Sequence, residues 1–198
     1  MIIANLSINL LGLLTFLFIF WKRLKEDYAS EIIFKSASYI FLGMSIFYLI
    51  SFNFIKDWFL WFSFFGGVLG LILAFYSQKV RFYESFESFV ISSLPWISLM
   101  FLTNSIQTSS LISFSGFVVM LILMFLAYWL EANYKKFFWY KSGKIGLSGL
   151  IILAVILTFR LTVAIFKIDM LSLVSLEKYL SGAFLILDIF LIYKLART

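Results

Sequence analysis

Long apolar runs alternate with short polar stretches along this chain, and this pattern predicts transmembrane helices. A helix needs about 20 consecutive apolar residues to cross the hydrocarbon core of a bilayer. Seven runs have this character, and they predict spanning helices over residues 2–21, 32–54, 58–76, 89–105, 111–130, 145–166 and 179–195. By this interpretation residues 1–198 form a single all-α transmembrane domain, a polytopic integral membrane protein with seven helices.

The fourth run is the weakest of the seven. A polar connection over residues 77–88 precedes it and contains Lys79, Arg81, Glu84 and Glu87. The run itself contains Pro95, the only proline of the chain. Proline removes one backbone hydrogen bond from a helix interior, so the sequence predicts a kink there.

Basic residues are distributed unevenly between the two sides of the predicted bundle. If successive connections alternate between sides, three basic residues, Lys56, Lys167 and Lys178, lie on one side and twelve on the other. The twelve are Lys22, Arg23, Lys25, Lys35, Lys79, Arg81, Lys135, Lys136, Lys141, Lys144, Lys194 and Arg197. Cytoplasmic connections of membrane proteins carry the excess of Lys and Arg. The sequence therefore predicts an outside N-terminus, a cytoplasmic C-terminus and a multi-pass protein of the cell membrane.

Composition narrows the chemistry that the chain can perform. Its residues are 63% hydrophobic and 13% charged, with a mean hydropathy of +1.04, which is far from the values of soluble domains. There is no cysteine and no histidine, so disulfides, thiolate metal ligands, cysteine nucleophiles and the commonest general base are excluded. Because the basic residues lie in short connections, where they orient helices in a bilayer, we expect no nucleic-acid partner. We expect no metal and no cofactor either.

Glycines follow a run of aromatic residues between Trp58 and Gly70. Gly66 and Gly70 are four residues apart, and small residues at this spacing let two helices approach each other closely in lipid. The alternative is that Gly66 and Gly67 mark a place where the chain approaches a ligand. The sequence leaves both interpretations open.

Two ionisable residues, Arg160 and Asp188, lie inside predicted spans, where charges usually face a partner or a water-filled cavity. Arg160 precedes Lys167 by roughly 10 Å of helix, and Asp188 follows Lys178 by roughly 15 Å. One interpretation is an Arg160–Asp188 ion pair that locks the last two helices. The other is that Arg160 lines an outward-facing cavity and binds an anion, for which a phospholipid phosphate is the obvious candidate.

The order of several landmarks along the chain is similar to that of a known family. They are a charged turn after the first span, residues 42–48 (Leu-Gly-Met-Ser-Ile-Phe-Tyr), residues 63–67 (Ser-Phe-Phe-Gly-Gly) and Arg160 in the sixth span. Further landmarks are Gly12, Ser85, Phe86, Pro95, Gly143, Leu171, Ser172 and Ser181. On these residues the chain resembles the bacterial prolipoprotein diacylglyceryl transferase family over nearly its whole length.

The resemblance implies an inner-membrane protein with seven spans, an outside N-terminus and a cytoplasmic C-terminus, which agrees with the distribution of basic residues. It also implies transfer of a diacylglyceryl group from phosphatidylglycerol to the lipobox cysteine of a prolipoprotein. The expected partners are then a membrane phospholipid and a prolipoprotein signal peptide. Candidates for contacts to the lipid phosphate are Arg160, Gly66, Gly67, Asn104 and Lys167.

Most of the polar positions of the family's site are replaced in this chain. Phe65 stands where the family has a histidine before two glycines, and Ser105 stands at the arginine of the family signature. The other replaced positions are Leu11 (tyrosine in the family), Ser45 (arginine), Thr108 (asparagine), Ser113 (glutamate), Ile156 (tyrosine) and Ala164 (glutamate). Phenylalanine cannot accept a thiol proton, and serine cannot hold a phosphate as a guanidinium does. We therefore expect weakened or lost transferase activity in a pseudoenzyme that keeps a phospholipid-accommodating cavity.

Two alternatives remain. One is an active transferase with a rearranged site, which uses Arg160 together with Glu84 or Glu87. The other is a non-catalytic interaction protein or small transport protein, in which Lys56, Asp57 and the polar residues 104–113 contact a partner at the outer face.

Overall fold

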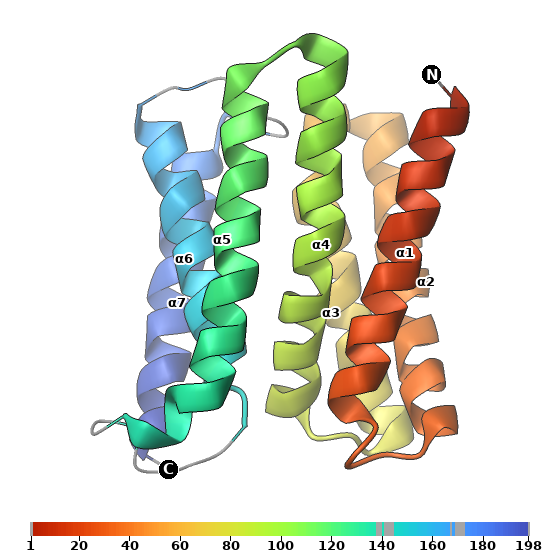
Figure 1. The fold of residues 1–198 in the computed structure, drawn as a ribbon, viewed down its shortest axis with the longest axis vertical. Coiled ribbons are helices and arrows are strands. Elements are labelled where there is room, and N and C mark those ends of the chain that lie inside the picture. The colour runs from red at the N-terminus through yellow and green to blue at the C-terminus, as the bar shows by residue number, and fades with distance from the viewer. Residues whose placement is uncertain (1, 138–139, 141–144, 167, 169–172, 198) are drawn as a thin grey trace.

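The computed structural model describes residues 2–137, 140, 145–166, 168 and 173–197. Seven α-helices run up and down in Figure 1: α1 (Ile2–Leu24), α2 (Ser30–Phe54), α3 (Phe59–Gln78), α4 (Phe82–Thr108), α5 (Leu111–Asn133), α6 (Leu147–Ile165) and α7 (Glu177–Arg197). Two short 3-10 helices, η1 (Lys56–Trp58) and η2 (Tyr134–Lys136), lie between them. No strand occurs within the described ranges. By length and composition, the seven helices can each cross a membrane.

The helix predictions are confirmed, with the largest boundary difference at α4. This helix begins at Phe82, so the prediction that residues 77–88 form a polar connection is wrong. The polar residues responsible for that prediction, Glu84 and Glu87, are each only 4% exposed, because they lie inside the bundle and not in a loop. The helix continues through Pro95 to Thr108 over 27 residues, which is long enough to span. The kink at Pro95 stays a prediction.

α4 is the central helix of the bundle. Every residue from Glu84 to Ser92 is buried, because α4 packs against α1, α3, α5 and α6. α2 pairs mainly with α3, and α7 pairs mainly with α6. The bundle therefore has two tightly paired groups, α2–α3 and α6–α7, on either side of α4 (Figure 1).

Glycines bring the backbones of α2 and α3 together. A Cβ atom added to Gly66 would overlap the carbonyl of Gly43, and one added to Gly70 would overlap the backbone of Tyr39 and Ile40. Only residues without a side chain permit this approach, and such contacts are typical of helices that pack in lipid. This confirms the helix-packing interpretation of the Gly66 and Gly70 spacing.

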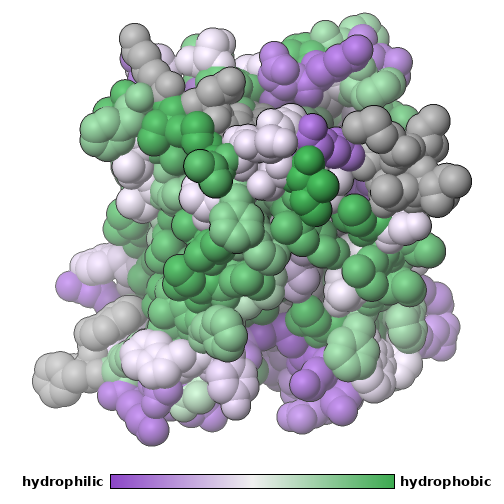
Figure 2. Space-filling view, turned by 45° about the horizontal axis from the view of Figure 1, so that its top comes forward, coloured by the Kyte–Doolittle hydropathy of each residue, from purple (hydrophilic) through white to green (hydrophobic). Residues whose placement is uncertain are grey.

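The outer surface of the bundle is apolar around its middle. Large side chains such as Leu49, Phe125 and Phe190 are exposed on α2, α5 and α7. Figure 2 shows hydrophobic side chains gathered across the middle of one face, with hydrophilic side chains mainly above and below them. A soluble monomer rarely exposes so much contiguous apolar surface, so this distribution suits a protein surrounded by lipid.

Candidate functional site

Arg160 of α6 and Glu177 of α7 form a buried two-point ion pair. Arg160 donates from Nε to Glu177 Oε1 at 2.6 Å and from Nη2 to Oε2 at 2.9 Å. Trp61 Nε1 and Ser181 Oγ donate to the same carboxylate at 2.9 and 2.8 Å. Glu177 is 1% exposed and Arg160 is 8% exposed. The four hydrogen bonds tie α3, α6 and α7 together, since each of these helices contributes a partner.

The predicted Arg160–Asp188 ion pair is wrong. α7 begins at Glu177, and Asp188 lies eleven residues later in the same helix, or roughly 16 Å along its axis. Glu177 therefore reaches Arg160, whereas neither carboxylate oxygen of Asp188 has a hydrogen-bond partner. The prediction missed Glu177 because it placed the residue before the last span. The sequence did contain a signal for Glu177: acidic residues are favoured in the first turn of a helix, and Ser181 follows it by one helical turn.

An aromatic side chain completes the surroundings of the ion pair. The Arg160 guanidinium lies 5.7 Å from the centroid of the Trp61 ring, within the range of a cation–π contact. Trp61 in turn packs in a small apolar cluster with Leu157 and Val174. Because Trp61 also donates to Glu177, it holds both partners of the ion pair at once.

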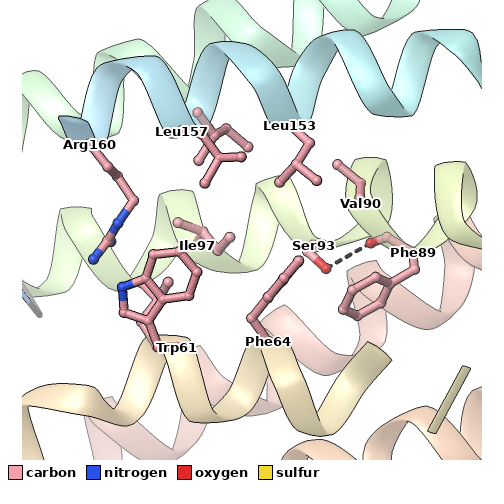
Figure 3. A pocket seen from close by; sticks show the side chains of 11 residues that line it. Trp61, Phe64, Phe89, Val90, Ser93, Ile97, Leu153, Leu157 and Arg160 are labelled. Atoms are coloured by element: carbon pink, nitrogen blue, oxygen red, sulfur yellow. Dashed lines mark hydrogen bonds between the residues drawn. The ribbon is translucent and has the colours of Figure 1, made fainter. Parts of the chain in front are cut away.

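Two adjoining cavities lie between α3, α4, α6 and α7. The arginine cavity, of about 70 Å³, is lined by Leu60, Trp61, Phe64, Phe89, Val90, Ser93, Ile97, Leu153, Ile156, Leu157 and Arg160. The aspartate cavity, of about 180 Å³, is lined by Phe64, Val68, Phe82, Tyr83, Phe86, Leu150, Leu153, Leu157, Phe184, Leu187, Asp188 and Leu191. Figure 3 shows Trp61 and Phe64 facing Leu153, Leu157 and Arg160 across the arginine cavity.

The two cavities together form a groove along one face of α6. They share Phe64, Leu153 and Leu157. On α6 the lining runs from Leu150 to Arg160, with intervals of three and four residues that keep the side chains on one face. At 1.5 Å per residue, this groove extends roughly 15 Å along the helix axis.

The aspartate cavity contains a buried acid. Leu187 lines it and is 53% exposed, so the cavity lies close to the surface of the bundle at this residue. Asp188, the next residue of α7, lines the same cavity but is only 2% exposed. The groove thus comes close to the surface at an apolar residue and has a carboxylate inside.

Phe65, which the resemblance aligns with a histidine, belongs to an aromatic stack. Its ring centroid lies 5.7 Å from that of Trp61 and 5.5 Å from that of Phe184. Gly66 and Gly67 are buried against Gly43 and Phe89 respectively, and neither lines the groove. These three residues therefore serve packing between helices, and the structure does not place the glycines at a lipid phosphate.

The polar residues at the end of α4 bond to one another. Asn104 Nδ2 donates to Ser113 Oγ at 2.6 Å, Ser105 Oγ to the Ser110 carbonyl at 3.0 Å, and Thr108 Oγ1 to the Asn104 carbonyl at 2.7 Å. Such local bonds compete with helix continuation and stabilise turns. These side chains shape the α4–α5 turn. The four predicted positions among them, Asn104, Ser105, Thr108 and Ser113, do not line the groove.

The remaining predicted positions are scattered. Leu11 and Ser45 are exposed on the outer faces of α1 and α2. Ile156 lines the arginine cavity, and Ala164 is half-buried near the end of α6. Lys167 lies outside the described residues. Of the predicted positions, the structure brings only Ile156 and Arg160 together at the groove, with Asp188 farther along it.

A second buried polar cluster lies at the opposite end of the bundle. Arg23 Nη2 of α1 donates to Glu87 Oε1 of α4 at 2.6 Å, and Arg23 also pairs with Glu131 of α5. Glu87 faces the backbone amides of Gly146 and Gly149 at the start of α6, where a helix favours negative charge. The alternative pairing of Arg160 with Glu87 is therefore wrong. Arg160 pairs with Glu177 near the end of α6, whereas Glu87 pairs with Arg23 near its start.

Glu84 belongs to the same end of the bundle. It accepts a hydrogen bond of 3.0 Å from the Tyr28 hydroxyl, which in turn accepts one from the Arg81 backbone amide at 3.0 Å. Burial raises the pKa of the Tyr28 hydroxyl, so it stays protonated as a donor. Glu84 is consequently not available to act with Arg160 either.

The features of the candidate site are therefore an apolar groove, a neutralised ion pair at one end and an unpartnered carboxylate inside it. The described part of the chain contains no group of three or more His, Cys, Asp or Glu residues that could hold a metal ion. Comparison with protein-family models, with curated proteins and with solved structures finds no match to this chain.

Proposed function

We propose that this protein is a multi-pass membrane protein that holds the apolar chain of a membrane amphiphile in the groove along α6. In this proposal the protein shares the fold of the prolipoprotein diacylglyceryl transferases, which its sequence resembles, but does not perform their transfer reaction. The single observation that carries it is the pair of adjoining apolar cavities that share Phe64, Leu153 and Leu157 and come close to the surface at Leu187.

Charge supports a membrane orientation with the Arg23 cluster on the cytoplasmic side. The end of the bundle where α1 and α7 finish has ten of the described basic residues: Lys22, Arg23, Lys25, Lys35, Lys79, Arg81, Lys135, Lys136, Lys194 and Arg197. The other end has Lys56 and Lys178. Following the positive-inside rule, the N-terminus is outside and the C-terminus is in the cytoplasm. Arg160 and Glu177 then lie toward the outer side.

Packing provides the reason for a chain to enter the groove. Lipid tails are already in an apolar medium, so the hydrophobic effect contributes little when one moves from the bilayer into the protein. An unfilled cavity, however, deprives its lining of van der Waals contacts. A flexible hydrocarbon chain restores these contacts along Leu150, Leu153 and Leu157.

The polar groups of the site support a non-catalytic role. Arg160 is already neutralised by Glu177, so a lipid phosphate would have to displace a two-point partner. Phe65 fills its position with a ring between Trp61 and Phe184. Transfer to a thiol needs a base and groups that hold the departing phosphate. Among the described lining residues Arg160 is the one cationic side chain, and Glu177 engages it, so the groove offers binding to an apolar chain without a group to hold a departing phosphate.

Native mass spectrometry of protein purified in a mild detergent tests the proposal. The wild-type protein is expected to retain one amphiphile. Leu153→Trp, which fills the part that both cavities share, is expected to lose it. Val155→Trp is the matched control, because Val155 is 37% exposed on another face of α6. Retention by Leu153→Trp, or no bound amphiphile on the wild-type protein, contradicts the proposal.

A further inference from the structure

The Asp188 carboxylate is unusual because it is buried without a partner. It is 2% exposed, and neither of its oxygens has a hydrogen bond. Among the twelve described residues that line the aspartate cavity, Asp188 is the only charged one, and Tyr83 is the only other one with a polar side chain. Arg160 lines the neighbouring cavity and is bonded to Glu177. The described residues around this cavity therefore provide no cation for Asp188.

A carboxylate in apolar surroundings is unfavourable until a proton or a cation accompanies it. A hard metal ion is a poor candidate, since Ca²⁺ takes six to eight oxygen ligands and Mg²⁺ requires six. An organic ammonium ion needs fewer oxygen ligands, because one carboxylate can balance its charge and the faces of aromatic rings can make cation–π contacts with it. The cavity offers these rings in Phe64, Phe82, Tyr83, Phe86 and Phe184.

We propose that the aspartate cavity binds an organic ammonium group carried on an apolar chain, with Asp188 as its counter-ion. Phe184 precedes Asp188 by four residues, so both lie on one face of α7 beside the bound cation. The chain occupies the rest of the groove, along Leu153 and Leu157 toward Arg160. This inference rests on the proposed function and names the head-group chemistry of the same ligand.

The size and charge of the cavity narrow the class of ligand further. A volume of about 180 Å³ is comparable with an apolar cavity of about 150 Å³ that holds benzene. A compact alkylammonium head fits such a space. A zwitterionic phospholipid head would bring a phosphate next to Asp188, and none of the described residues that line the cavity has a cationic side chain to receive it. The ligand is therefore a single-charge cationic amphiphile and not a phospholipid.

Binding measurements on the full-length protein in neutral maltoside micelles test this inference. Isothermal titration calorimetry compares dodecylammonium, dodecyltrimethylammonium, dodecanol and a short-chain phosphatidylethanolamine. Dodecylammonium can donate charge-assisted hydrogen bonds to the Asp188 carboxylate. Dodecyltrimethylammonium has no N–H, and it pairs with the carboxylate through its charge and with the aromatic rings through their faces. We therefore expect both cationic amphiphiles to bind at least tenfold more tightly than dodecanol. Phosphatidylethanolamine is expected to bind no better than dodecanol.

Two variants, Asp188→Asn and Phe184→Leu, test whether the aspartate cavity causes the preference for cationic amphiphiles. Asp188→Asn is expected to bind dodecylammonium and dodecanol equally, while Asp57→Asn, which removes an exposed acid in η1, keeps the wild-type ratio. Phe184→Leu retains the acid and is expected to reduce the affinity for dodecyltrimethylammonium several-fold. It provides an independent test if Asp188→Asn fails to fold, as judged from its elution volume and helical circular dichroism.

The outcomes separate this inference from the proposed function. Equal binding of dodecanol and the cationic amphiphiles to the wild-type protein would overturn the ammonium site and leave the groove as a site for apolar chains. An undiminished cation preference in Asp188→Asn, or tight binding of phosphatidylethanolamine, would also overturn it. Failure of every amphiphile to bind would instead contradict the proposed function.

Discussion

The Arg160 guanidinium and the Glu177 carboxylate contact each other at two points inside the bundle, at 2.6 and 2.9 Å. An arginine buried in a membrane helix is often a binding group for an anion. Here its partner comes from the next helix of the same chain, and Trp61 and Ser181 complete the coordination of the acid. A structural ion pair therefore lies at the arginine end of the groove.

Replacement of Glu177 by Gln should destabilise the protein strongly. It leaves the Arg160 charge buried without a counter-ion, and breaking one side of a buried pair costs about 3 kcal/mol or more. Thermal unfolding in detergent, followed by circular dichroism, measures the change. Glu31→Gln is the control, because Glu31 pairs with Lys35 on an exposed helix face and should leave the midpoint unchanged. Equal midpoints for the two variants would show that the buried pair contributes little.

Phe65→Glu and Phe65→His would introduce a potential base at the position that the resemblance to the transferases aligns with a histidine, and we expect neither variant to support transfer. Arg160 remains engaged by Glu177, and Ser105 and Ala164 still stand at replaced positions. Complementation of a bacterial strain depleted of its own transferase measures this, with that strain's enzyme as the positive control. Rescue by Phe65→His alone would mean that the transfer site is largely intact.

Gly66→Ala should loosen the α2–α3 pair. The added methyl group overlaps the carbonyl of Gly43, and overpacking of this kind costs about 1–3 kcal/mol. Gly182→Ala on α7 is the matched control, since an added Cβ meets nothing within 4 Å there. Because alanine favours a helix over glycine by up to about 1 kcal/mol, that control should be neutral or stabilising. Urea or thermal unfolding that ranks the two variants in the reverse order would contradict the contact.

The membrane orientation can be tested directly, because the chain contains no cysteine that would react in the background. A single cysteine at Lys178 should react with a membrane-impermeant maleimide added to intact cells. A cysteine at Lys25 should react only after the membrane is permeabilised. Both lysines are exposed, at opposite ends of the bundle. The reverse labelling pattern would invert the proposed topology.

Local sequence was sufficient for the helices and for one of their contacts. Apolar runs long enough to form a span carry their signal in consecutive residues, so the seven predicted ranges coincide with seven helices. The four-residue spacing of Gly66 and Gly70 likewise depends only on helical periodicity, and both glycines lie at the α2–α3 contact. The start of α4 was mispredicted because Glu84 and Glu87 resemble loop residues until their buried partners are known.

The pairing of charges was decided only by the tertiary structure. The sequence by itself determined that Arg160 and Asp188 lie within spans, but it did not determine their partners. A partner depends on where two helices sit relative to each other, and in the structure this places Glu177, at the start of α7, beside Arg160, with Asp188 eleven residues farther along the helix. The same helix placement leaves Asp188 unpartnered and turned toward a cavity built by four helices, which no local pattern of residues encodes.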